Sequence, residues 1–264
     1  TRRPVPGFAE MQMSFGGGFS SYHGLQAKIE KKYSNGFYLI NSFTWSKVMD
    51  LSSGHLESFN GDNSRVNYRN IASERAQGGY NQPINNTTTF VWEVPYGKGR
   101  KWGSSNHWLM DGVLGGWRLT GINLMTAGQP VSITYSIPSG ASVSGEPTYR
   151  PNYIGGSIYA DSGNPTIYLN RAAFALPSTS QPFGSVGRNI ARSPAIYNFD
   201  GGAHKAFSLP WEGTRVEFRA EFFNLFNKSN LGAPNTNFSN ANFGTITGLA
   251  SPARQIQFAL KLAF

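Results

Sequence analysis

Long runs in which apolar and polar residues alternate one by one recur along this chain. The final run, QIQFALKLAF (255–264), keeps the alternation to its last residue. Because successive side chains of a strand point to opposite faces, each run predicts a β-strand with one apolar and one polar face. In the run 214–223 the apolar positions stand opposite a row of charges, within which we expect ion pairs: Arg215, Glu217, Arg219 and Glu221.

Two of these runs flank Asn35-Gly36, a dipeptide that is the strongest short-range signal for a β-hairpin. Another run, around Met11–Phe15, precedes them, and residues 116–136 predict a further strand whose faces are mixed. We count about eight strands of about nine to thirteen residues, whereas strands of soluble proteins most often have about five or six. A tilted strand that crosses a lipid bilayer needs about 9 to 11 residues, so these lengths favour a membrane protein.

The connections between the predicted strands are sorted by length. If the strands run up and down, the short turns SNG (34–36) and PWEG (210–213) lie at one end, together with a medium connector at 97–115. GGGFSS (16–21) lies at the other end with the long loops, which are 48–85, 136–193 and 227–253. Outer-membrane barrels have this arrangement, with short periplasmic turns and long extracellular loops. The sequence therefore predicts an all-β, antiparallel, up-and-down transmembrane β-barrel portion. In such a barrel we expect the charged residues Arg215, Glu217, Arg219 and Glu221 to face the wet lumen.

Composition and motifs narrow the function classes. The chain has no cysteine, which excludes disulfides and thiolate metal sites. Its net charge of +9 invites a nucleic-acid role, but the basic groups are dispersed and no RNA-reading signature accompanies them. None of the four histidines has metal-ligand spacing, and the sequence contains no nucleophile elbow and no phosphate loop. We therefore expect no nucleic-acid partner, no cofactor, no metal and no enzymatic activity.

Several stretches of the chain occur in an order that resembles one family. They are SSYHGLQAKIEKKYSNGFYLINSFTWSKVMD (20–50), VPYGKGRKW (94–102), GGWRLTGI (115–122), FRAEFFNLFN (218–227) and RQIQFALKLAF (254–264). Together they resemble the C-terminal part of a TonB-dependent outer-membrane receptor, in particular the Oar-like group that carries an N-terminal carboxypeptidase-regulatory-like domain. The resemblance covers essentially the whole chain.

This resemblance implies a barrel of about 22 strands whose lumen is closed by an N-terminal plug. Such a receptor lies in the bacterial outer membrane and takes up a scarce ligand, whose class (siderophore, glycan or peptide) the sequence leaves open. Residues 1–264 contain no plug and no energy-coupling box. We expect either the C-terminal part of a larger barrel or a barrel of about eight strands derived from a transporter's end. For the lone chain we expect an open sheet, because two strand edges would lack partners.

The end of the chain resembles an assembly signal. In outer-membrane barrels a last strand that ends in an aromatic residue is similar to the signal read by the barrel-assembly machinery. Phe264 is that residue here, with Phe258, Leu260 and Leu262 behind it; the alternative is an apolar last strand without a signalling role. The other implied partners are outer-membrane lipid and lipopolysaccharide, TonB through the missing N-terminal part, and an unknown small ligand.

Aromatic residues supply two further candidate sites. Trp45, Trp92 and Trp117 lie near predicted strand ends, where rings form a girdle at the lipid headgroups; ordinary packing is the alternative. In the loop 136–193, aromatic rings among many amides and hydroxyls suit a glycan or peptide ligand, and a loop that packs on itself is the alternative. The candidate ligand residues are Tyr149, Tyr153, Tyr159 and Tyr168.

Two other classes of protein fit parts of the pattern. One is a self-contained small outer-membrane barrel that acts as an adhesin or a structural protein. The other is a soluble, extracellular carbohydrate-binding β-sandwich, in which Arg219 and Glu221 would project between two packed sheets. Burying such charges is very costly, so the position of these two side chains distinguishes a sandwich from a barrel.

Overall fold

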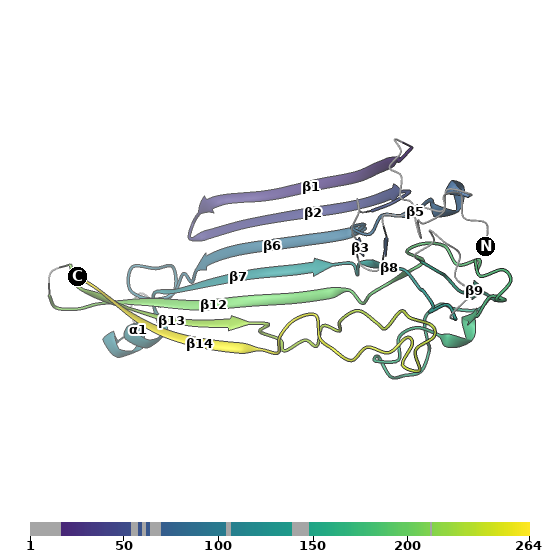
Figure 1. The fold of residues 1–264 in the computed structure, drawn as a ribbon. Helices are drawn as coiled ribbons and strands as arrows, with labels where there is room; N and C mark the ends of the chain where they lie inside the picture. Colours follow the sequence, from purple (N-terminus) through teal and green to yellow (C-terminus); the bar gives the residue numbers. More distant parts are fainter. Residues whose placement is uncertain are drawn as a thin grey trace.

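The computed structural model describes residues 17–53, 58–59, 62–63, 70–103, 107–138, 148–211 and 213–264. Within this part of the chain, long strands form one antiparallel sheet in which each strand pairs with its neighbours in sequence order (Figure 1). The strands are β1 (Ser20–Ser34), β2 (Phe37–Asp50), β6 (Ile84–Glu93), β7 (Trp117–Thr126), β12 (Ile196–Ser208), β13 (Arg215–Phe223) and β14 (Gln255–Ala263). The predicted all-β, up-and-down arrangement is therefore confirmed.

Among the described strands the sheet is open. β1 and β14 are its two edge strands, and they do not pair with each other. The open sheet that we expect for the lone chain is thus confirmed for this part of it. The strand predicted around Met11–Phe15 lies outside the described residues.

Short elements occupy the connections. The strand β5 (Ala76–Gln77) pairs with the end of β2. The other paired segments are β3 (Ser58–Phe59) with β4 (Asp62–Asn63), β8 (Pro130–Val131) with β11 (Ala191–Arg192), and β9 (Asn152–Tyr153) with β10 (Phe174–Ala175). The helical elements are η1 (Ile71–Glu74), α1 (Trp108–Leu114) and η2 (Arg171–Ala173). No helix in the described part of the chain is long and apolar enough to span a membrane.

The two ends of the sheet differ, as Figure 1 shows. At one, which we call the turn end, lie the hairpin turn at Asn35-Gly36, the connector 94–116 with α1, the turn 209–214 and the C-terminus. Asn35 and Gly36 have φ values of 51° and 74°, as a tight hairpin turn of this type requires. At the other, the loop end, lie the connections 51–83, 127–195 and 224–254.

The register of the sheet separates the side chains into two faces. Residues that lie opposite one another on neighbouring strands share a face. The apolar face carries Leu25, Ile29, Phe37, Leu39, Phe43, Trp45, Phe90, Trp92, Trp117, Leu119, Phe199, Val216, Phe218, Phe222, Ile256, Phe258, Leu260 and Leu262. The polar face carries Lys28, Glu30, Ser42, Thr44, Thr87, Thr89, Glu93, Arg118, Thr120, His204, Arg215, Glu217, Arg219, Glu221, Gln257 and Lys261.

Aromatic rings pack across the apolar face. The ring of Phe218 lies 6.1 Å from that of Trp117 and 6.2 Å from that of Phe258, measured between centroids. Phe90 and Phe199 approach each other at 6.4 Å beside Gly121, where an added Cβ atom would lie only 2.3 Å from Phe90 Cε1. The glycine therefore makes room for the ring of Phe90 on the middle of this face.

β7 is shorter than the sequence predicts. The run 116–136 predicts one long strand, but β7 ends at Thr126. Ala127 N still donates to Ile84 O of β6 at 2.8 Å, but from Gln129 on the backbone bonds to another loop, since Ser193 N donates to Gln129 O at 2.9 Å. An added Cβ atom at Gly128 would lie 1.7 Å from Ser193 O, so the two segments cross at a distance that only glycine permits.

The buried core lies in the loops. Side chains on both faces of the sheet are mostly half-buried or exposed, whereas Ile133, Ala173 and Ala191 are fully buried. The residues of this core, which we call the loop cluster, are Val131, Ile133, Tyr135, Tyr149, Leu169, Ala173, Phe174, Val186, Ala191, Phe238 and Phe243. The sheet therefore resembles a wall, and the compact part of the protein sits at its loop end.

Candidate functional site

The charged row of β13 lies on the polar face. Residues two apart on a strand point the same way, so Arg215, Glu217, Arg219 and Glu221 form one column. Arg219 Nε donates to Glu217 Oε1 at 3.0 Å, and Arg219 Nη2 donates to Glu217 Oε2 at 3.2 Å. The ion pairing that the sequence predicts is therefore present between these two residues. On the neighbouring strand β12, His204 lies opposite Arg219.

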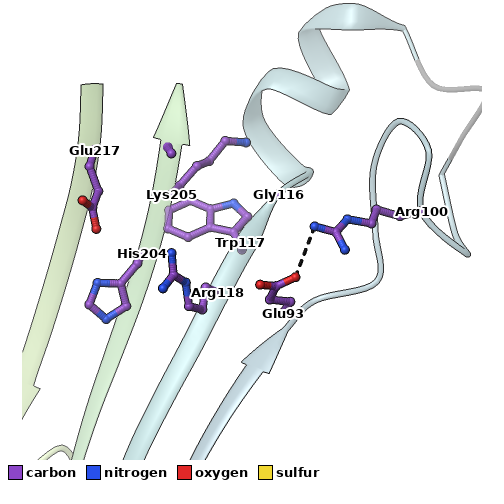
Figure 2. A pocket seen from close by; sticks show the side chains of 9 residues that line it. Glu93, Arg100, Gly116, Trp117, Arg118, His204, Lys205 and Glu217 are labelled. Carbon is purple, nitrogen blue, oxygen red and sulfur yellow. Dashed lines mark hydrogen bonds and ion pairs between the residues drawn. The ribbon is translucent and has the colours of Figure 1, made fainter. Parts of the chain in front are cut away.

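Near the turn end this polar face contains a shallow recess (Figure 2). Glu93, Arg118, His204 and Glu217 line it from four neighbouring strands. Arg100, from the connector 94–116, closes one side by an ion pair with Glu93 at 3.3 Å. The recess holds about 150 Å³, whereas sites for small organic ligands hold about 300–1,000 Å³. Its size suits water or a small ion, and its mixed charges suit a hydrated surface.

No metal centre is evident in the described ranges. They contain no group of three or more histidine and acidic side chains that could hold a metal ion. The nearest polar contact of His204 is with Thr120, whose Oγ1 lies 3.2 Å from Nε2. His204 is thus held by the sheet's own polar face.

The three tryptophans singled out by the sequence share the apolar face. Trp45 lies toward the loop end of β2 and is 61% exposed. Trp92 and Trp117 lie at the turn end of β6 and β7. Rings near both ends of an apolar face have the placement that a girdle needs. The girdle role itself stays a prediction.

Three further tryptophans at the turn end escaped the sequence analysis. Trp102, Trp108 and Trp211 are 52%, 72% and 68% exposed. They belong to connections and not to alternating runs, so strand periodicity carries no signal for them. Trp108 is the first residue of α1, which lies within the connector 97–115 and was not predicted as a helix.

The residues of the predicted assembly signal lie on the edge strand β14. Phe258, Leu260 and Leu262 point to the apolar face and are 67%, 73% and 56% exposed. Phe264, just beyond the strand, is 98% exposed. β14 pairs with β13 on one side and with no other described strand on the other. These side chains and this strand edge are accessible to another protein, and the signalling role stays a prediction.

The asparagine-rich loop after β13 is ordered by its own side chains. Asn237 N donates to Asn235 Oδ1 at 3.0 Å, and Asn242 N donates to Asn240 Oδ1 at 2.9 Å. Such bonds, from an amide side chain to the backbone two residues on, form compact turns. The loop then contributes Phe238 to the loop cluster. Its many amides therefore build the loop as well as facing outward.

Two arginines of the 127–195 connection, the buried Arg188 and the half-buried Arg150, pair with acidic residues at the end of β2 and in the 51–83 connection. Arg188 pairs with Asp50, and it also donates to Ser53 Oγ at 3.1 Å. Arg150 binds Glu74 through two nitrogens, at 3.0 and 2.6 Å. Buried charges are tolerated when they are paired in this way. Sequence reasoning missed these clamps, because each partner stands alone in a polar loop.

The four candidate ligand tyrosines differ in exposure. Tyr149 belongs to the loop cluster, where its ring stacks on Phe183 at 5.9 Å. Tyr153 and Tyr159 are 41% and 39% exposed. The rings of Tyr159 and Tyr168 meet edge to face at 5.3 Å. Burial, and next the neighbouring Tyr159, raise the pKa of Tyr168 above its usual value, so its phenol stays neutral at physiological pH.

These positions favour packing for some of the four and access for others. Tyr149 is enclosed, so a ligand could reach it only if the loop cluster opened. Tyr153 and Tyr159 present accessible ring surface on the outside of the loops. Their role in ligand binding stays a prediction.

A single sheet of long strands, apolar on one face and charged on the other, defines a membrane-spanning β-barrel wall and not a soluble sandwich. The protein-family model described as "Outer membrane beta barrel domain" matches residues 1–257, and the chain belongs to this family. No curated protein matches the chain significantly. The protein lies in the bacterial outer membrane. Barrels of this kind present their apolar face to lipid and their polar face to the lumen, with short turns at the periplasmic end and long loops at the extracellular end.

Proposed function

We propose that this chain is the C-terminal barrel segment of a TonB-dependent outer-membrane receptor that takes up a scarce ligand. The observation that carries the proposal is the open sheet of the described residues, in which β1 and β14 are both edge strands. In a bilayer each unpaired backbone group costs several kcal/mol, so these edges require further strands. A wall that long strands already form, extended by more, closes into a wide barrel of the size that transporters use.

The charged polar face supports the same proposal. A barrel of about eight strands has an interior that side chains fill. The column from Arg215 to Glu221 would then face other charges, such as Lys28 and Glu30 of β1, across a narrow core. In a wide, hydrated lumen these side chains keep their water. The self-contained small barrel, as an adhesin or structural protein, is therefore the weaker candidate.

The loop end supplies the surface where such a receptor would meet its ligand. Ion pairs and the loop cluster hold together the described parts of the 51–83, 127–195 and 224–254 connections. Tyr153 and Tyr159 offer exposed rings on these loops. Aromatic rings beside amides suit a siderophore, a glycan or a peptide, and the ligand class remains open between them.

We propose the partners that this role requires. Lipid and lipopolysaccharide would surround the apolar face, the barrel-assembly machinery would read the strand that ends at Phe264, and TonB would act through an N-terminal part of the receptor. We also propose that the chain has no catalytic activity and no nucleic-acid partner, as its sequence predicts.

The test begins with the complete gene. We expect the same reading frame to encode a plug domain and an energy-coupling segment upstream of these residues. A deletion strain should then lose growth on one limiting nutrient from a panel of ferric siderophores, peptides and oligosaccharides, and loss of TonB should give the same defect. A complete gene that encodes about eight strands and no plug would refute the proposal.

A further inference from the structure

Helix α1 exposes almost all of its apolar surface. Trp108, Leu109, Met110, Val113 and Leu114 are 72%, 54%, 49%, 66% and 48% exposed, and no residue of the helix is buried. A helix this short is not stable by itself in water, and surface apolar groups of this kind usually mark a contact with something else. The question is what covers them.

The helix is fastened to the lipid-facing side of the sheet. Trp117 and Lys205 both belong to the apolar face, on which they lie opposite each other. Trp117 Nε1 donates to Val113 O at 2.8 Å, and the ammonium of Lys205 donates to the carbonyls of Asp111 and Gly115. In Figure 2 the Lys205 side chain extends toward the helix. These carbonyls form the C-terminal end of the helix, where a cation is favoured by the helix dipole.

This attachment also explains a lysine on a lipid-facing surface. Lys205 is 5% exposed, and its Nζ lies 5.7 Å from the centre of the Trp117 ring and 5.2 Å from that of Phe207. An ammonium facing lipid would be costly. Here α1 covers it and supplies its hydrogen-bond acceptors, so the helix must lie against the outer side of the barrel wall.

The same connector carries exposed cations. Lys98, Arg100 and Lys101 precede the helix, and the Lys101 ammonium lies 5.5 Å from the centre of the exposed Trp102 ring. Arg100 pairs with Glu93, whereas Lys98 and Lys101 have no ion pair among the described residues and so provide positive charge near the helix. Apolar groups beside basic groups and tryptophans, at the rim of a lipid-facing wall, match the chemistry of a phospholipid headgroup layer.

We propose that α1 and the basic residues before it form an interfacial anchor that binds anionic phospholipid of the periplasmic leaflet. Leu109, Met110, Val113 and Leu114 enter the boundary of the acyl chains, and Lys98 and Lys101 face the phosphates. Lys205 and Trp117 are positioning residues that hold the helix at this depth. The anchor depends on the outer-membrane location and not on the transport role.

Residues 1–264 contain no cysteine, so an introduced thiol can be labelled selectively once any cysteine outside these residues has been replaced by serine. In the complete protein, folded into vesicles of phosphatidylethanolamine and phosphatidylglycerol, Leu109→Cys and Val113→Cys variants would each carry an environment-sensitive fluorophore. Ser208→Cys, at the turn end of β12 but on the polar face, is the matched control. We expect blue-shifted emission at 109 and 113, at least twofold quenching by lipids with a nitroxide near the headgroup, and neither effect at 208.

Two outcomes would overturn the anchor. Emission at 109 and 113 equal to that at 208 would mean that water covers the helix. Blue-shifted emission that lipid nitroxides do not quench would mean that protein covers it.

The positioning role has its own test. Lys205→Met should reduce the lipid quenching at 109 severalfold, when only protein that migrates as the folded form on unheated gels is scored. Trp117→Phe removes the bond to Val113 and keeps a ring, and it serves as a second variant if Lys205→Met fails to fold. Unchanged quenching in the folded variants would refute the assignment.

Replacing Lys98 and Lys101 by Gln should remove any preference of the helix for phosphatidylglycerol over phosphatidylcholine, and a preference that persists would refute the charge contact.

Discussion

Arg188 and Asp50 form an ion pair in which each side chain is only 3% exposed, although 138 positions separate the two residues in sequence. The pair joins the loop end of β2 to the last part of the 127–195 connection. Ser53 Oγ bonds to both partners, so removal of either charge leaves the other buried with too few polar contacts.

We therefore expect Arg188→Met to destabilise the extracellular loops by about 3–5 kcal/mol, because an unpaired buried carboxylate remains. Limited proteolysis of the folded barrel, with denaturant, measures this change. Lys28→Met is the control, since the Lys28–Glu30 pair is 58% and 35% exposed and such pairs contribute well under about 1 kcal/mol. Equal protection of the loops in the two variants would contradict this prediction.

Phe264→Asp should impair assembly into the outer membrane. The aromatic ring is 98% exposed, so the fold itself hardly depends on it, and a loss would point to recognition by another protein. Lys261→Gln, on the polar face of the same strand, should leave assembly unchanged. The measurement is the amount of folded, heat-modifiable protein in the membrane fraction. Normal amounts of the Phe264→Asp protein would end the assembly-signal interpretation.

Substitutions on the two faces of β13 test which face meets lipid. Phe222 lies on the apolar face in the row of Gly121 and Gly201, which are near the middle of β7 and β12, so Phe222→Arg should destabilise the barrel by about 2–4 kcal/mol. Phe218→Arg should cost less, because Phe218 lies nearer the turn end, beside Trp117. Glu221→Arg, which changes the lumen side next to Phe222, should have a small effect. Folding titrations into vesicles compare the three, and equal losses would show that the faces are misassigned.

A polar group interrupts the lipid-facing surface. Asn41 Nδ2 donates to Asn86 Oδ1 at 2.8 Å and to Thr88 Oγ1 at 2.7 Å, all on the apolar face. Asn41→Leu should destabilise the barrel by about 1–3 kcal/mol, because it leaves acceptors unpaired in an apolar environment. Asn41→Leu combined with Asn86→Leu should recover part of that loss. A double-mutant cycle in vesicles measures the coupling, and additive losses would argue that the two side chains do not depend on each other.

Much of the sheet could be predicted from the sequence, because water on one side and lipid on the other impose alternation. β13 and β14 follow from this alternation, and the hairpin of β1 and β2 follows from Asn35-Gly36. The same rule predicts too long a strand at β7. Val131, Ile133 and Tyr135 alternate as a strand would, but they are buried in the loop cluster. Alternation records that one side is apolar, and it does not record whether lipid or protein provides the apolar contact.

Whether a part of the candidate sites could be predicted depends on whether a local sequence pattern or a contact between distant residues forms it. The charged column on β13 was predictable because a strand places residues two apart on one face. The clamps of Arg188 and Arg150 were not, since they join distant loops through single residues. The attachment of α1 was also missed, because its key contact, Lys205 to the end of the helix, depends on tertiary placement alone.

A core that belongs to the loops has a mechanical consequence. Loops that each hang from a sheet can fluctuate one at a time, and a solute can pass whenever one of them swings aside. Loops that share Phe174, Phe238 and Leu169 in one packed interior cannot do so without breaking that interior. If the chain belongs to a transporter, as proposed, passage of a solute would require these loops to move together about the ends of their strands.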